Sequence, residues 1–97
     1  MTTKLHEYDV AKHLRSREEM AAYLEAAIAE SDGDAAFIAM ALGDIARAKG
    51  MAELSRETGL GRESLYKALS ADGNPQLSTV LKVAKALGLQ LHIKPAA

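Results

Sequence analysis

Five side chains of one short segment have the types and the spacing that suit contact with DNA. They are Arg62, Glu63, Ser64, Tyr66 and Lys67. On a helix these side chains share the outward face, because Leu65 and Leu69 take the inward one. An arginine can donate two hydrogen bonds to a guanine edge, a lysine can neutralise a phosphate, and a hydroxyl can make either contact. The segment therefore predicts a helix face that binds DNA.

The residues in front of this face supply the element that must position it. The stretch from 50 to 70 predicts two short amphipathic helices, over about 51–58 and 62–70, joined by a tight turn at Gly59. Glycine suits that turn because the chain must leave the first helix with a positive φ. The residues expected to face inward are Leu54, Leu60, Leu65 and Leu69. This layout is typical of a helix-turn-helix, although a plain helical hairpin of a bundle would show the same pattern.

Some of the candidate DNA contacts also have a simpler structural interpretation. Glu63 stands four residues before Lys67, so the two can form a salt bridge on the helix surface. Tyr66 can be a core residue with only its hydroxyl at the surface. Ser78 and Thr79, at the start of the next predicted helix, can bind phosphate through side-chain and backbone donors, or can simply cap that helix.

Two helices are expected before the pair. Ser16 and Glu19 have the spacing of a capping box, which predicts a helix from 16 to about 30. Asp34 is the expected N-cap of a second helix that runs to about Lys49 and ends at Gly50. The residues predicted to face inward from these two helices are Met20, Tyr23, Leu24, Ala27, Ile28, Phe37, Ile38, Ala41, Leu42 and Ile45.

The C-terminal part predicts a fifth helix and a strand. The helix spans about 77–87 and stops at Gly88. Residues 89–94 then alternate apolar and polar side chains, which is the pattern of a half-buried strand. That strand needs a partner, which can be the segment 8–14, its own copy in a dimer, or the sheet edge of another protein. The 97 residues thus predict one small domain, mainly α, with five helices, a short C-terminal β-strand and an N-terminal segment over 1–15.

Composition limits the classes of protein to which the chain can belong. There is no cysteine, no apolar run of membrane-spanning length and no secretion signal, so we expect a cytoplasmic protein without a membrane partner. The net charge is −1, but residues 1–34 carry eight Asp/Glu against four Lys/Arg, whereas residues 35–97 carry eight Lys/Arg against five Asp/Glu. This asymmetry indicates one basic and one polyanionic partner, unless it arises by chance.

Catalysis is the least supported function. His6, His13 and His92 have no metal-ligand spacing, and no cysteine accompanies them. Asp32 and Asp34 flank a glycine in a turn, where helix capping explains them. No nucleophile arrangement or glycine-rich phosphate loop is visible. We therefore expect no enzyme activity, no metal, no cofactor and no small-molecule substrate.

Several motifs together give the chain a specific family resemblance. They are Tyr23–Ala27, Ala41–Met51, Thr58–Leu60, Arg62–Ser70, Gly73–Pro75 and Val80–Gly88. On these residues, the stretch from 8 to 91 resembles the probable addiction-module antidote proteins, a branch of the Xre/lambda-repressor-like helix-turn-helix family. The resemblance implies a lambda-repressor-like domain and an antitoxin that binds its own operator DNA and neutralises a small toxin. The toxin it implies is a RelE-like, ribosome-dependent mRNA endonuclease.

The sequence departs from the family pattern at two places. Gly61 stands where serine is more common before the second helix, so a hydroxyl that can reach a phosphate is missing. Ala52 and Glu53 stand where threonine and glutamine are common, and a carboxylate near DNA is repelled by phosphate. These departures predict modest operator affinity for the protein alone.

The expected partners divide the chain into surfaces. One helix-turn-helix offers few base contacts, so we expect a homodimer on two half-sites. Its predicted interface is Leu87, Leu89, Leu91 and Ile93, unless these side chains only close the monomer core. The acidic stretch from 5 to 28, with Glu18, Glu19 and Tyr23, is the predicted toxin-binding surface. A stand-alone prophage-type repressor without a toxin is the main alternative, and a protein-interaction module that no longer touches DNA is another.

Overall fold

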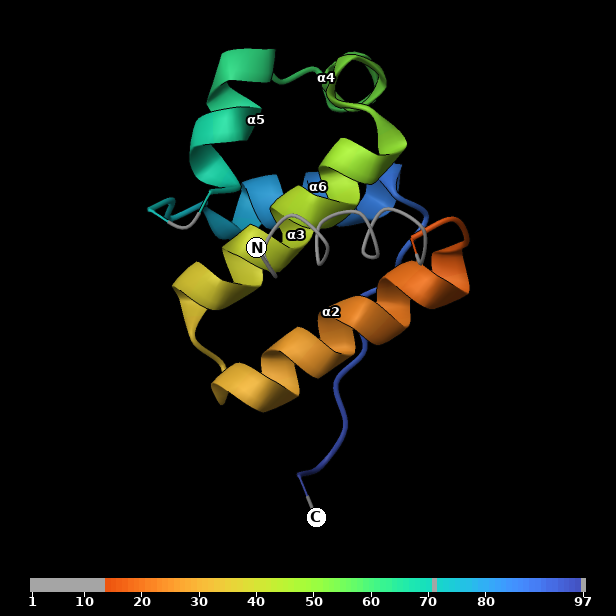
Figure 1. The fold of residues 1–97 in the computed structure, drawn as a ribbon, viewed down its shortest axis with the longest axis vertical. Coiled ribbons are helices and arrows are strands. Elements are labelled where there is room, and N and C mark those ends of the chain that lie inside the picture. Colours follow the sequence, from red (N-terminus) through yellow and green to blue (C-terminus); the bar gives the residue numbers. More distant parts are fainter. Residues whose placement is uncertain (1–13, 71, 97) are drawn as a thin grey trace, which may run out of the picture.

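The computed structural model describes residues 14–70 and 72–96, and these form five helices (Figure 1). The helices are α2 (Arg17–Ser31), α3 (Ala35–Lys49), α4 (Met51–Thr58), α5 (Arg62–Ala68) and α6 (Leu77–Ala86). The prediction of a mainly helical chain with five helices is confirmed for this part of the protein. The predictions for the N-terminal segment up to residue 13, including His6, His13 and most of the proposed strand partner, lie outside the described residues.

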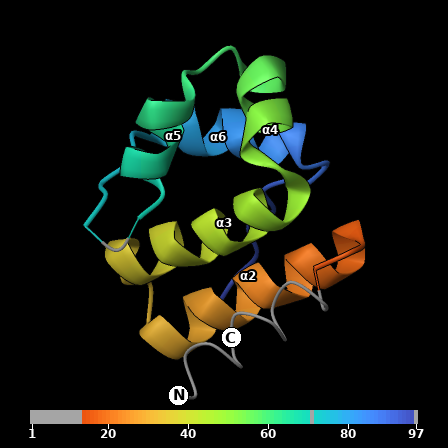
Figure 2. The ribbon, with the colours of Figure 1, turned by 45° about the horizontal axis from the view of Figure 1, so that its top comes forward.

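Helix α3 lies between α2 on one side and the group of α4, α5 and α6 on the other (Figures 1 and 2). The long helix α3 runs back along α2, and the two pack against each other (Figures 1 and 2). On the other side of this pair, α4 contacts α3, α5 and α6. The short helix α4 therefore connects α5 to α3 and α6.

Local capping explains where the first two helices begin. The Ser16 hydroxyl accepts a hydrogen bond from the Glu19 amide at 3.1 Å, and the Glu19 carboxylate accepts one from the Ser16 amide at 3.1 Å. The predicted capping box is thus present. Asp34 caps α3 in the predicted way, because its carboxylate accepts a hydrogen bond from the Phe37 amide at 3.1 Å.

Apolar side chains from every described helix meet in one core. Its buried members are Leu14, Met20, Leu42, Ile45, Ala46, Met51, Leu54, Leu65, Leu69, Val83 and Leu87. Three of the four leucines predicted to face inward from the helix pair are fully buried, and Leu60 packs against the core from its edge. The prediction for Ile28 is wrong, since 43% of this residue is exposed at the surface of α2. Phe37 and Ile38 are only half-buried.

A glycine allows α3 to approach the end of α5. A Cβ atom placed on Gly43 would lie 2.2 Å from the carbonyl oxygen of Leu69, which no real side chain can tolerate. Leu69 follows α5 directly and is buried in the core. The absence of a side chain at residue 43 thus sets the closest distance between the middle of α3 and the C-terminal end of α5.

The predicted C-terminal strand is wrong. Residues 89–94 contain no strand, and within the described chain they have no ladder partner. Gly88 leaves α6 with a φ of 78°, after which the Leu89 amide donates to the carbonyl of Ala84 at 2.9 Å. Leu89 is half-buried against the core, but Leu91 and Ile93 are 58% and 93% exposed. The alternating pattern is present, but a strand forms only when a second strand supplies its hydrogen bonds.

Candidate functional site

The turn between α4 and α5 is held by two hydroxyl groups. The Thr58 hydroxyl donates to the carbonyl of Leu54 at 2.8 Å and accepts from the Leu60 amide at 3.2 Å. The Ser55 hydroxyl donates to the Leu60 carbonyl. Gly59 has a φ of 78°, the left-handed conformation expected for it. These bonds hold the turn from which α5 starts, and helical spacing in the sequence gives no signal for either hydroxyl.

Helix α5 presents to solvent all five of the DNA-contact residues that were predicted on it. Arg62, Glu63, Ser64, Tyr66 and Lys67 are exposed, while Leu65 between them is fully buried. Tyr66 is 50% exposed, so the alternative of a core tyrosine is wrong. Among the described residues the Arg47–Asp44 contact is the sole ion pair, and Glu63 therefore does not bridge to Lys67. The charged groups of α5 are thus free to meet an external partner.

The starts of α5 and α6 carry no side-chain caps. Gly61 is the N-cap of α5 and Gln76 the N-cap of α6, and neither provides a side-chain hydrogen bond to the first turn. Ser78 is exposed and Thr79 is half-buried in the first turn of α6. Ser78 and Thr79 do not cap α6, because the N-cap position of this helix is Gln76.

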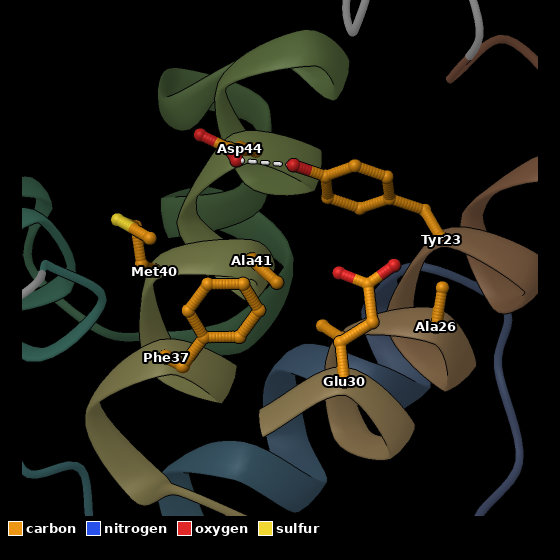
Figure 3. Close-up of a pocket in the computed structure, with 8 residues that line it drawn as sticks. Tyr23, Ala26, Glu30, Phe37, Met40, Ala41 and Asp44 are labelled. Carbon is orange, nitrogen blue, oxygen red and sulfur yellow. Dashed lines mark hydrogen bonds between the residues drawn. The ribbon is translucent and has the colours of Figure 1, made fainter. Parts of the chain in front are cut away.

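A second surface feature lies between α2 and α3, and Figure 3 shows it in close-up. The phenol of Tyr23 on α2 donates a hydrogen bond to Oδ2 of Asp44 on α3 at 2.6 Å. The other carboxylate oxygen, Oδ1, accepts from the Arg47 guanidinium at 2.7 Å. Burial and, next, the hydrogen bond to Asp44 raise the pKa of the Tyr23 phenol well above its ordinary value. The phenol is therefore a proton donor that ties the two helices together.

Beside this hydrogen bond the two helices leave an open groove of about 240 Å³. Ala26 and Glu30 line it from α2, and Phe37 and Met40 line it from α3. In Figure 3 the Glu30 carboxylate points into the space that faces the Phe37 ring. The sequence did not predict this groove, because helical spacing placed Phe37 among the inward-facing residues. The exposure of Met40, at 37%, agrees with the periodic pattern, which leaves this residue out of the inward-facing set.

The predicted toxin-binding residues all lie on α2 and differ in what their side chains contact. Glu18 and Glu19 are exposed in the first turn of α2, and the Glu19 carboxylate accepts hydrogen bonds from the amides of Arg15 and Ser16. Tyr23 faces α3, where its hydroxyl is bonded to Asp44. Glu19 therefore has a structural role in capping, and Tyr23 has one in helix packing.

The predicted dimer residues divide between core and surface. Leu87 is 2% exposed and belongs to the core, and Leu89 packs against the core. These two residues therefore close the monomer core, which was the alternative to a role in the dimer interface. Leu91 and Ile93 are exposed. Helix α6 adds Leu77, which is 69% exposed, and Leu81, which is 44% exposed. These four side chains are the apolar surface of the C-terminal half.

The described residues show neither a metal site nor a membrane span. Within 14–70 and 72–96 no three His, Asp or Glu side chains gather as metal ligands. His92 is exposed in the C-terminal tail. None of the helices of this part of the chain has the length and apolar character to cross a bilayer.

Comparison with known proteins gives two matches over nearly the whole chain. Residues 4–95 match a family model described as "Probable addiction module antidote protein". A protein of Haemophilus influenzae, described as "Uncharacterized protein", is 49% identical over 94 residues, which cover 97% of this chain and 95% of the relative. No solved structure matches the chain.

Proposed function

The chain belongs to the family of probable addiction module antidote proteins, and on that premise we propose that it is the antitoxin of a type II toxin–antitoxin module. In this proposal the protein binds its toxin directly and represses its own operon by binding operator DNA. The family match over residues 4–95 carries the antitoxin role. The exposed polar face of α5 supports DNA binding.

The burial of one face of α5 and the exposure of the other support the proposal that this helix enters the major groove. Its apolar residue Leu65 is fully buried, and the hydrogen bonds of Thr58 hold the turn before it. Arg62 is the side chain best suited to a guanine edge, because its guanidinium can donate two parallel hydrogen bonds. We assign Lys67 to the phosphate backbone, where a point charge positions the helix without reading sequence. Ser78 and Thr79, at the uncapped start of α6, are assigned to phosphate as well.

A homodimer forms part of the proposal, since one helix of seven residues reads only a few base pairs. The apolar residues that a second copy can cover are Leu77, Leu81, Leu91 and Ile93, all of which are exposed. Leu87 and Leu89 no longer belong to the proposed interface because they pack in the monomer core.

The proposed toxin is RelE-like, an mRNA-cleaving protein that acts on the ribosome. A protein that binds RNA needs a basic surface, and the segment from Arg17 to Asp34 is strongly acidic. Charge complementarity therefore supports α2 as part of the toxin interface. The proposal assigns binding roles and no catalysis to the chain. It also places the protein in the cytoplasm, where operator DNA and ribosomes are found.

A mobility-shift titration tests the DNA part of the proposal. The probe is the DNA upstream of the gene, titrated at two salt concentrations with the native protein and with an Arg62→Ala, Lys67→Ala double variant. A Lys85→Ala, Lys94→Ala double variant is the matched control, since it removes two exposed positive charges outside α5. We expect the native protein and the control to bind, and the α5 variant to lose the specific complex.

Two results would contradict this assignment. Equal loss of binding in both double variants would mean that net charge, rather than the α5 face, drives the interaction. No binding by the folded native protein, with or without the product of the adjacent gene, would mean that α4 and α5 do not bind DNA. The protein would then be a protein-interaction module. The absence of any toxic partner beside an operator-binding protein would instead favour the stand-alone repressor.

A further inference from the structure

We propose that the groove between α2 and α3 receives one apolar side chain of the toxin, flanked in the toxin by lysine or arginine. This inference rests on the proposed antitoxin function and gives it a location. It moves the centre of the toxin interface away from Glu18 and Glu19 to the groove that Ala26, Glu30, Phe37 and Met40 line.

The size of the groove favours a side chain over a free small molecule. Its volume of about 240 Å³ lies below the range of roughly 300–1,000 Å³ that is typical of small-molecule sites. One leucine, phenylalanine or similar anchor fits a hollow of this size. The Phe37 ring and the exposed Met40 side chain offer it apolar contact, and methionine adapts to an irregular partner. Anchors that fill such hollows commonly carry much of the energy of a protein interface.

The wall of the groove next to Tyr23 is fixed before any partner arrives. Tyr23 donates to Oδ2 of Asp44, and Arg47 donates to Oδ1 of the same carboxylate. The hydrogen bond from Tyr23 crosses from α2 to α3 at one end of the groove, as Figure 3 shows. The groove is thus largely formed in the free protein, which reduces the ordering cost of binding.

The charge around the groove selects a basic partner. The segment from Arg17 to Asp34 holds six carboxylates and a single arginine. The positive charge of Arg47 is already matched by Asp44, whereas Glu30 has no hydrogen bond or ion pair with any described residue. A cation in the partner that lies beside the anchor can therefore meet the Glu30 carboxylate. An acidic or purely apolar partner would leave this charge desolvated without compensation.

The test measures toxin binding by two groove variants, each with a control on the same helix. Ala26→Arg fills the groove, and its control is Ala21→Arg. Glu30→Lys reverses the charge at the rim, and its control is Glu25→Lys. All four residues are exposed, and each control lies about 140° around α2 from the residue it matches, outside the groove lining. The ligand is the product of the adjacent gene, separated from the co-expressed complex by denaturation, refolded and titrated calorimetrically.

We expect Ala26→Arg to raise the dissociation constant by at least about 30-fold, as the loss of a hot-spot contact does. Glu30→Lys should raise it about tenfold at low salt, with a smaller effect at high salt. Both controls should bind like the native protein. Operator binding in the mobility-shift assay should be unchanged in all four variants, which shows that they are folded.

Two outcomes overturn the inference, and they are distinguishable. Tight toxin binding by the native protein that neither groove variant weakens, or that the controls weaken equally, places the interface elsewhere and leaves the antitoxin function intact. No binding between the native protein and the product of the adjacent gene overturns the antitoxin function, and the groove proposal with it.

Discussion

Tyr23 on α2 donates a 2.6 Å hydrogen bond to the carboxylate of Asp44 on α3, across a sequence separation of 21 residues. This contact joins the two longest helices and closes one end of the groove between them. It therefore connects the stability of the domain to the surface that we propose for the toxin.

Removing the Tyr23 hydroxyl should weaken the domain without unfolding it. Tyr23→Phe keeps the ring and deletes the bond, while Asp44 keeps its contact with Arg47. We expect the free energy of unfolding to fall by about 1–2 kcal/mol, because the acceptor is charged but only partly buried. Urea unfolding followed by circular dichroism measures this change. Tyr66→Phe is the control, since the half-exposed Tyr66 makes no side-chain hydrogen bond to a described residue, and a loss as large as that of Tyr23→Phe would refute the assignment.

The same bond predicts a pH dependence at alkaline pH. Burial and Asp44 raise the pKa of the Tyr23 phenol above its ordinary value of 10.0, with Glu30 adding to the shift and Arg47 opposing it. The unfolded chain then loses the Tyr23 proton before the folded chain does, so this stabilisation is complete below pH 10 and declines as the pH rises above it. The stability of the native protein should fall more steeply above pH 10 than that of Tyr23→Phe. Parallel curves from pH 8 to 11 would contradict the raised pKa.

A methyl group at residue 43 should separate α3 from the end of α5. Gly43→Ala would place its Cβ 2.2 Å from the Leu69 carbonyl oxygen, a backbone atom that cannot move alone. We expect a loss of about 1–3 kcal/mol, as for other overpacked sites, although alanine is the better helix former. Thermal unfolding monitors the change. Gly61→Ala serves as the control because the nearest atom there is the Ser64 Oγ at 3.9 Å, and it should cost less than about 1 kcal/mol.

The Thr58 hydroxyl should matter for both stability and DNA binding. Thr58→Val removes the bonds to Leu54 and Leu60 that hold the turn before α5, at a cost of about 1 kcal/mol. A looser turn also leaves α5 less well oriented, so operator affinity should fall at a temperature where the variant is folded. Thr58→Ser retains the hydroxyl and should restore most of both properties. Unchanged operator binding in Thr58→Val would show that the Thr58 hydroxyl is not needed to orient α5 for DNA binding.

The α5 charges should appear in the salt dependence of operator binding. Each lost phosphate contact lowers the slope of log K against log salt by about 1. Arg62→Ala, Lys67→Ala should therefore reduce the slope by as much as about 2 if both side chains bind phosphate. If Arg62 reads a guanine instead, the slope should fall by about 1 and discrimination between operator sequences should be lost. The Lys85→Ala, Lys94→Ala control should keep the native slope, and a slope as low as that of the α5 variant would argue against direct contacts from α5.

The amino-acid sequence by itself determined where the helices begin and turn, because the signals are local. Ser16 with Glu19, and Asp34, satisfy amides within three residues of themselves. Gly59 takes the positive φ that its position requires. The inward leucines of α4 and α5 follow from helical spacing alone, and so does the exposure of Arg62 and Lys67.

Only the tertiary structure decided what depends on partners distant in the sequence. The alternation of residues 89–94 has the period of a strand, yet strand hydrogen bonds must come from another segment, and none is present in the described chain. Leu87 became a core residue because α6 folds back onto α4. The groove beside Phe37, Met40 and Glu30 exists because α3 packs along α2 at a distance that the Tyr23–Asp44 bond helps to set. Local patterns specify elements, whereas the surfaces between elements follow from how the elements pack.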